Sequence, residues 1–248
     1  MKLLFDIGNT TIGIALLNEE DKVVQSHRLN TNLTKTADEY YLDIKQLVSL
    51  DKINSIAIAS VVPVVTKVIK TLATKFFNIE PFIVQASAKT GLQVITDNPK
   101  EVGADIICTA AAVIDPKEST LILDLGTATK YIYIRKNALI GVILTPGVKI
   151  SIEALVGNTA LLPNIDIKVP NKVLGTNTVE CMQSGATYGV AAQVDGLIDK
   201  IKAEVKEDFK IVVTGGLSKV IIPLLQHETI VEPNLIYYGL NEIQKRNI

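Results

Sequence analysis

Short apolar runs alternate with amphipathic stretches along almost the whole chain. Runs of about four to eight apolar residues between turn residues are typical of buried strands, whereas apolar residues three or four apart are typical of helices. The first half predicts helices at 35–50, 64–77 and 103–113, and strands at 3–6, 12–17, 23–28, 55–62 and 82–85.

The second half repeats this order of elements. It predicts a helix after Pro146, a long helical region at 178–205, and strands at 120–124, 130–135, 138–144 and 211–214. Each half is therefore a three-stranded meander followed by alternating helices and strands, which is typical of an α/β domain. Asp115, Pro116 and Lys117 interrupt the apolar pattern, so we expect two lobes, 1–116 and 117–248.

Two of the predicted strands end in the same short motif. Each leads into Asp-x-Gly and then a turn rich in hydroxyl or amide groups: Asp6, Gly8, Asn9 and Thr10 in the first copy, and Asp124, Gly126, Thr127, Ala128 and Thr129 in the second. Such a turn can cradle phosphate through its backbone N–H groups, and an Asp at a strand end can bind Mg²⁺. One copy is ordinary hairpin chemistry. Two copies with matching flanks predict a duplicated fold with a phosphate site between its halves.

A third glycine motif follows the strand predicted at 211–214. There the chain enters Gly215-Gly216 and then a helix, an arrangement that lets the flat face of a nucleoside lie on bare backbone. Alone this is a weak signal. Walker A and protein-kinase motifs do not occur in the sequence, so the common nucleotide-binding folds are not supported.

Composition narrows the class of protein. Lys and Arg number 25 against 26 Asp and Glu, so no basic surface predicts a nucleic-acid partner. Cys108 and Cys181 are too few for a disulfide framework or a zinc site. No apolar run is long enough for a membrane span, and Asp6 and Asn9 interrupt the first run too early for a signal peptide. We expect a cytoplasmic protein.

The three glycine motifs, in this order, resemble the phosphate-1, phosphate-2 and adenosine motifs of the superfamily of acetate and sugar kinases, Hsp70 and actin. Within it, the chain resembles the type III pantothenate kinases over nearly its whole length. The segments that carry this closer resemblance are Ser60–Pro63, 97–105, Pro146-Gly147, 159–163 and 175–185. The resemblance implies two actin-like (RNase H-like) lobes with mixed sheets and an ATP cleft between them.

The resemblance also implies a reaction, namely transfer of the γ-phosphoryl group of ATP to the primary hydroxyl of pantothenate, the first step toward coenzyme A. It implies Mg²⁺ at Asp6 and Asp124, a monovalent cation such as K⁺ or NH₄⁺, and Asp105 as the general base. A carboxylate within hydrogen-bond reach can orient such a hydroxyl, although Asp105 is also explained as a residue favoured near a helix N-terminus. The implied substrate-binding positions are Thr96, Gly103, Asp105, Ile106 and Thr178.

Three positions depart from the family pattern. Ile106 stands where the family has an Arg that helps to hold pantothenate, and Thr96 stands where it has a Tyr. Lys130 follows the second Asp-x-Gly motif where the family continues Thr-x-Asp, a region associated with the monovalent cation. We expect the Lys130 ammonium to substitute for that cation; the alternative is a solvated lysine on an edge strand.

Several functions therefore stay open. The first is an active pantothenate kinase with a rearranged acceptor pocket, or a kinase of a related hydroxy acid. The second is a vestigial or regulatory nucleotide-binding protein, and a sugar or acetate kinase is a weaker third. Gly185 and Gly189 suggest a homodimer through close helix packing, in which Thr178 would come from the other subunit. Alternatively, these glycines permit packing inside one lobe or mark a kink.

Overall fold

The computed structural model describes all 248 residues, Met1–Ile248. They form two compact units. The first unit comprises Met1–Pro116, Asn137–Leu139 and Asn234–Ile248, and the second comprises Lys117–Lys136 and Ile140–Pro233. The two predicted lobes, 1–116 and 117–248, stay a prediction, and the structure groups residues 137–139 and 234–248 with the first unit.

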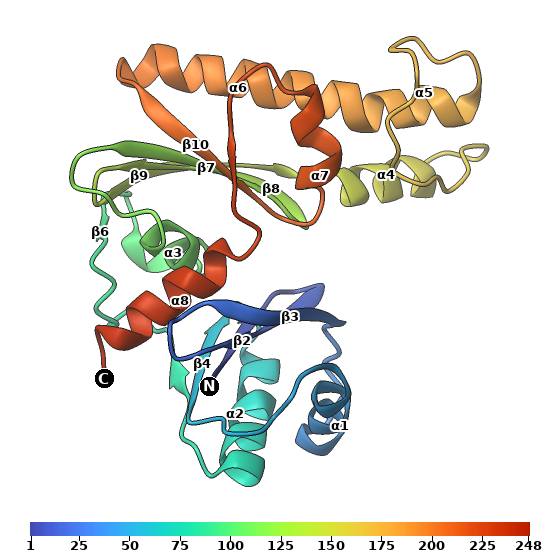
Figure 1. Cartoon of the computed structure of the whole chain (residues 1–248). Helices are drawn as coiled ribbons and strands as arrows, with labels where there is room; N and C mark the ends of the chain where they lie inside the picture. The colour runs from blue at the N-terminus through green and yellow to red at the C-terminus, as the bar shows by residue number, and fades with distance from the viewer. The chain divides into compact units, whose positions relative to one another are not determined.

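A five-stranded mixed sheet forms the centre of the first unit (Figure 1). Its order is β3-β2-β1-β4-β5, with β1, β2 and β3 antiparallel and β4 and β5 parallel to β1. This is the predicted meander followed by parallel strands. The strands are β1 (Lys2–Ile7), β2 (Thr11–Leu17), β3 (Val23–Asn30), β4 (Ser55–Ser60) and β5 (Phe82–Ile83).

Helices cover both faces of this sheet. Because neighbouring side chains on a strand point to opposite faces, Leu3 and Phe5 pack with α1 (Ala37–Leu47) and α2 (Pro63–Phe77). Leu4 belongs to a second buried cluster, with residues of α3 (Ala104–Ala111) and α8 (Leu235–Lys245). Asp6 is two residues after Leu4 on the same strand, so its side chain points to the same face of the sheet, the one covered by α3 and α8.

Local sequence explains where the first two helices begin. At the start of α1, the Thr36 side chain accepts from the Glu39 N–H while the Glu39 side chain accepts from the Thr36 N–H, forming a capping box. Helix α2 begins at Pro63, where a missing N–H is harmless, and ends at Asn78 in the left-handed conformation. These signals are local, and the corresponding predicted helices are confirmed.

The second unit also has a mixed sheet, in which β7 pairs antiparallel with β8 and parallel with β10. The order is β11-β10-β7-β8-β9. Its strands are β7 (Ser119–Leu125), β8 (Ala128–Arg135), β9 (Ala138–Pro146, whose first two residues belong to the first unit), β10 (Phe209–Thr214) and β11 (Ile230–Val231). Its helices are α4 (Val148–Gly157), α5 (Thr178–Ser184), α6 (Val190–Val205) and α7 (Ser218–Ile221).

The predicted helical region at 178–205 is confirmed but is not one regular α-helix. A π-helical turn at Gly185–Gly189 separates α5 from α6. Such insertions are uncommon and often accompany a kink.

Two strands and one α-helix were not predicted: β6 (Gln93–Val94), which pairs in parallel with Ala138 and Leu139, β11, and α8. The strands are only two residues long. Helix α8 is the consequential omission, because it packs on the face of the first sheet that bears Asp6. No helix has the length and apolar character needed to cross a membrane. The predicted α/β class with mixed sheets is confirmed.

Candidate functional site

The turn between β1 and β2 holds the first Asp-x-Gly motif. The Gly8 N–H donates to the Thr11 carbonyl oxygen at 2.9 Å, and the Thr31 hydroxyl donates to the Gly8 carbonyl oxygen at 2.6 Å. The Thr31 N–H also donates to the Thr10 carbonyl oxygen at 2.9 Å, which ties the turn to β3. Asn9 and Thr10 are exposed. Hydrogen bonds from Thr31 and within the turn therefore fix its backbone, while the side chains of Asn9 and Thr10 face solvent.

Asp105 lies close to this end of the sheet. It occupies the first turn of α3, where the helix dipole favours a carboxylate. A Cβ atom on Gly103 would lie 2.5 Å from Asp105 Oδ1 and 3.5 Å from Val61, and the Val61 N–H donates to the carbonyl oxygen of Ile7 at 3.0 Å. The Asp105 carboxylate therefore lies near the carboxyl ends of β1 and β4.

Asp6 and Asp105 both lie close enough to the buried Cys108 thiol to affect its pKa. Burial first, and then the negative charges of Asp6 and Asp105, raise the pKa of the Cys108 thiol well above its usual range. The structure thus brings a predicted phosphate-site residue and the predicted base into one region of the first unit. The sequence separates them by most of this unit and offered no direct sign of the proximity.

The second Asp-x-Gly motif lies between β7 and β8 and packs against Gly147. The Gly147 N–H donates to the carbonyl oxygen of Thr127 at 3.1 Å. A Cβ atom at position 147 would lie 2.2 Å from the same oxygen, so only glycine fits there. This contact explains the Pro146-Gly147 pair in the sequence.

Gly215 brings the third motif beside the second. Strand β10 runs parallel to β7 with Thr214 opposite Asp124, so the two strands end at the same edge. Gly215 has φ +95°, and a Cβ atom there would lie 2.5 Å from the carbonyl carbon of Leu125. Both the backbone conformation and the close approach therefore require glycine. Open α/β sheets characteristically bind ligands at this carboxyl edge.

Lys130 forms an ion pair with Asp124. The two residues are opposite each other on β8 and β7, and the distance from Lys130 Nζ to Asp124 Oδ2 is 2.6 Å. Their side chains are only 18% and 17% exposed. Strand β8 lies between β7 and β9, so the alternative of a solvated lysine on an edge strand is wrong. An ammonium at this place compensates a carboxylate beside the second turn.

The carboxylates are not arranged as an all-protein metal cage. No cluster of three or more His, Cys, Asp or Glu side chains suited to a metal ion occurs in the chain. Mg²⁺ commonly uses only one or two carboxylates and completes its octahedron with waters and substrate phosphates. Asp6 in the first unit and Asp124 in the second each offer one carboxylate of that kind, and the carboxylate of Asp124 is also paired with Lys130.

The predicted acceptor-site residues are divided between the units. Thr96, Gly103, Asp105 and Ile106 belong to the first unit, and Thr178 to the second. The Thr96 hydroxyl is buried with no hydrogen-bond partner, which leaves it a donor and acceptor to satisfy. Thr178 is the exposed first residue of α5, following the Asn177 cap. Their roles toward an acceptor stay predictions.

Two residues near Asp6 escaped the sequence prediction, Tyr237 on α8 and Arg28 on β3. A Cβ atom on Gly13 would lie 2.4 Å from the Tyr237 hydroxyl oxygen, and Gly13 is opposite both Asp6 and Arg28 in the sheet. In the sequence, Gly13 was the one feature that could have pointed to this contact, because an isolated glycine within a strand often marks a close approach by another group.

A sequence model of the type III pantothenate kinases matches residues 2–200. The chain belongs to the type III pantothenate kinase family. Curated relatives named type III pantothenate kinase include one from Acholeplasma laidlawii, 43% identical over 248 residues and covered completely in both chains. Another, from an Exiguobacterium species, is 40% identical over 254 residues, covering 100% of this chain and 99% of the relative.

Solved structures share the fold at much lower identity. A Campylobacter jejuni protein assigned to the Baf family of transcriptional activators has TM-score 0.60 and 19% identity, covering 99% of this chain and 98% of the other. A Sinorhizobium meliloti protein assigned as a 2-dehydro-3-deoxygalactonokinase has TM-score 0.58 and 12% identity, with coverage of 99% and 98%. Component A of the Acidaminococcus fermentans (R)-2-hydroxyglutaryl-CoA dehydratase has TM-score 0.55 and 13% identity, with coverage of 100% and 99%. These likenesses confirm the predicted fold, which is that of actin-like ATPases and sugar kinases.

Proposed function

We propose that the protein transfers the γ-phosphoryl group of ATP to the primary hydroxyl of pantothenate, the first step of coenzyme A biosynthesis. The observation that carries the proposal is the full-length similarity to a relative named type III pantothenate kinase, at 43% identity. The location of Asp6 and Asp105 in the same unit, near the carboxyl end of β1, is consistent with it, because phosphoryl transfer uses a group that orients the attacking hydroxyl near the phosphates. We also expect a cytoplasmic location and no nucleic-acid partner.

Each proposed role uses the chemistry of the residue concerned. Asp105 accepts the proton of the attacking hydroxyl, which the carboxylate orients toward the phosphorus. Asp6 and Asp124 would each offer a carboxylate to Mg²⁺, which would supply positive charge to the phosphate oxygens when bound. The backbone of the two glycine turns binds phosphates, and Gly215-Gly216 provides a flat surface for adenosine. Positioning and charge neutralisation supply most of the rate acceleration in such reactions.

The acceptor pocket differs from the family pattern at Ile106 and Thr96. An isoleucine cannot form the bidentate contact that an arginine makes with a carboxylate. At position 96 the threonine hydroxyl, which is buried without a hydrogen-bond partner, is a smaller polar group than the tyrosine of the family pattern. A related hydroxy acid is therefore the second candidate acceptor, and a nucleotide-binding protein without transfer activity is the third interpretation.

We further propose that the Lys130 ammonium supplies the positive charge of a monovalent cation. The 2.6 Å ion pair with Asp124 supports this, since the ammonium is held beside the second phosphate turn. Turnover should then be the same in potassium-free and potassium-containing buffer. Strong activation by potassium or ammonium would contradict the substitution.

A homodimer through the α5–α6 region is part of the proposal. Cβ atoms on Gly185 and Gly189 would contact nothing within 4 Å, so packing inside the unit does not require glycine at either position. Both glycines line an open pocket of about 480 Å³ with Met182 and Leu155. The π-helical turn at Gly185–Gly189 supports the competing explanation, in which these glycines mark a kink in the helix. Sedimentation as a monomer at working concentration would remove the dimer from the proposal.

The central experiment is ATP-dependent phosphorylation of pantothenate by the wild-type protein and by Asp105→Asn. We expect turnover by the wild type and its loss in the variant, with nucleotide binding retained. Asp51→Asn is a matched control, because it removes the same charge from an exposed position in the first unit. If the wild type binds nucleotide but does not phosphorylate pantothenate, the acceptor is wrong and other hydroxy acids become the candidates.

A further inference from the structure

Three residues form a row across the first sheet at the end where β1 meets its turn. Gly13 on β2 is opposite Asp6 on β1 and, on its other side, opposite Arg28 on β3. Directly opposed residues of antiparallel strands point to the same face. This row therefore presents a carboxylate and a guanidinium with a gap at Gly13 between them.

Tyr237 of α8 occupies the gap. A Cβ atom on Gly13 would lie 2.4 Å from the Tyr237 hydroxyl oxygen and 3.5 Å from the Cβ atom of Asp6. The hydroxyl and the Asp6 side chain thus flank the same point. Tyr237 is 6% exposed. Burial and then the charge of Asp6 raise the pKa of the Tyr237 phenol, against an opposing effect of Arg28.

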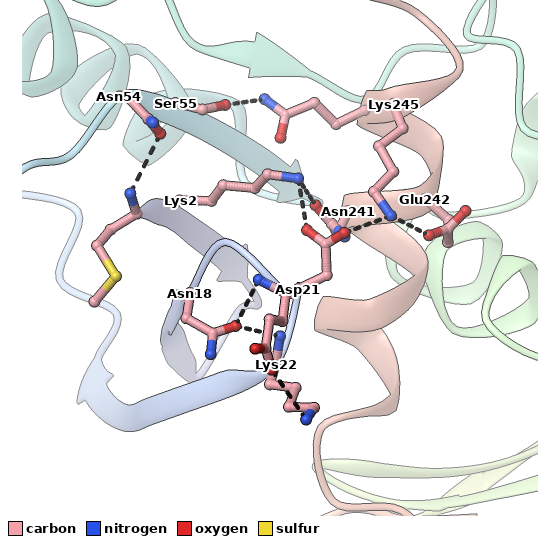
Figure 2. A network of polar contacts seen from close by, with 12 residues as sticks. Lys2, Asn18, Asp21, Lys22, Asn54, Ser55, Asn241, Glu242 and Lys245 are labelled. Carbon is pink, nitrogen blue, oxygen red and sulfur yellow. Dashed lines mark hydrogen bonds and ion pairs between the residues drawn. The ribbon is translucent and has the colours of Figure 1, made fainter.

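A polar network anchors α8 at the opposite end of β1 (Figure 2). Lys2 Nζ donates to Asn241 Oδ1 at 2.8 Å and to Asp21 at 2.7 Å, and Lys245 Nζ lies 2.6 Å from Asp21. The Gln244 side chain donates to the Ser55 hydroxyl at 2.7 Å. The anchored residues share one face of α8 with Tyr237, because helical positions i, i+4, i+7 and i+8 lie together.

The two elements also match in length. Lys2 to Asp6 spans about 13 Å of strand at ~3.3 Å per residue, and Tyr237 to Lys245 spans about 12 Å of helix at ~1.5 Å per residue. Asn241 and Lys245 contact Lys2 and Asp21 near the start of β1, and Tyr237, about two turns earlier in α8, lies near Asp6 at the end of β1. The network of Figure 2 thus holds one end of α8, and the same helix carries the Tyr237 hydroxyl close to Asp6 at the other end of β1.

We propose that Tyr237 is a positioning residue for Asp6, in which the buried phenol orients the carboxylate that binds the metal–nucleotide complex. The inference deepens the proposed function and rests on it for the role of Asp6. A neutral phenol can donate to one carboxylate oxygen and leave the other for a metal-bound water. Hydrogen-bonding groups behind a metal-binding carboxylate commonly set its orientation. Residue 237 lies outside the segment 2–200 that matches the family.

The first test is Tyr237→Phe, which removes the hydroxyl and keeps the ring. We expect the dissociation constant and the KM for Mg·ATP to rise about 10-fold, as is typical when an outer partner of a metal ligand is lost. The KM for the acceptor should stay unchanged, because Tyr237 acts through Asp6. Tyr238→Phe, the adjacent half-buried tyrosine, is the matched control and should leave both values unchanged.

The second test measures the geometry without any activity. Gly13→Ala should destabilise the wild-type protein, since the new methyl group would meet the phenolic oxygen at 2.4 Å. In the Tyr237→Phe background the nearest ring atom is Cζ at 3.4 Å, an ordinary contact, so the same substitution should be tolerated. A double-mutant cycle on unfolding by denaturant reports this coupling. Additive effects would overturn the placement of the hydroxyl.

The outcomes separate the inference from the proposed function. If the wild type binds Mg·ATP without phosphorylating pantothenate, the acceptor assignment fails, and Tyr237 is still tested by nucleotide binding. Equal Mg·ATP affinity of wild type and Tyr237→Phe would overturn the positioning role even if pantothenate is phosphorylated. A wild-type protein that does not bind Mg·ATP would overturn both.

Discussion

Gly239 permits the closest approach between α8 and α3. A Cβ atom at this position would lie 1.7 Å from the carbonyl oxygen of Cys108, 2.7 Å from its carbonyl carbon and 3.0 Å from the backbone nitrogen of Ala112. All three are backbone atoms, so no side-chain rotation can relieve the contact. Gly239→Ala therefore has to move one helix away from the other.

Two effects of Gly239→Ala oppose each other. Alanine favours a helix interior over glycine by about 1 kcal/mol. Restoring ordinary contact with the Cys108 oxygen requires a displacement of roughly 1.8 Å, given optimal separations of about 3.5 Å between heavy atoms. Overpacking typically costs about 1–3 kcal/mol, occasionally more, and a clash with rigid backbone belongs at the upper end. We expect a net loss of about 2 kcal/mol, which lowers Tm by roughly 4–8 °C for a chain of this size.

Gly196→Ala is the matched control, because Gly196 is exposed inside α6 and a Cβ atom there meets nothing within 4 Å. It should stabilise the protein by about 0.5–1 kcal/mol through helix propensity alone. Calorimetry and denaturant unfolding of both variants measure the difference. If Gly239→Ala raises Tm as much as Gly196→Ala does, the close packing of α3 against α8 is wrong.

Three further predictions concern separate parts of the molecule. Gly215→Ala should reduce stability by about 2 kcal/mol or more, since a positive φ costs roughly 1–2 kcal/mol for an L-residue and the methyl group would also meet backbone; Gly141→Ala, where a Cβ atom meets nothing within 4 Å, is the denaturation control. Lys130→Met should make turnover depend on potassium, because Asp124 loses its paired ammonium; unchanged potassium-independent turnover would count against the substitution. Burial acts to raise the pKa of Asp21, but hydrogen bonds from two lysines and an asparagine lower it to about 2. The stability that Asp21 contributes is therefore present above about pH 4 and lost as the pH falls toward 2, so denaturation midpoints of wild type and Asp21→Asn should differ at pH 6 and converge near pH 2.

The site could be predicted from sequence where its chemistry is local. The Asp-x-Gly turns, Gly215-Gly216 and Asp105 within a first helical turn each depend on a few adjacent residues. The alternation of apolar runs and helical spacings likewise predicted the two meanders and most helices. These features are readable because hydrogen bonding in a turn and the direction of successive side chains are determined by near neighbours.

Tertiary structure alone decided where α8 belongs and which groups meet at Asp6. The eleven-residue segment Leu235–Lys245 has an amphipathic pattern, but nothing near it in sequence specifies β1 and α3 as its partners. The close approaches made at Gly13 and Gly239, and the location of Asp105 near the end of β1, share this property. The sequence by itself determined the local turns, strands and helices, whereas the contacts between them depend on which apolar faces can be buried together, a condition that only the folded chain as a whole satisfies.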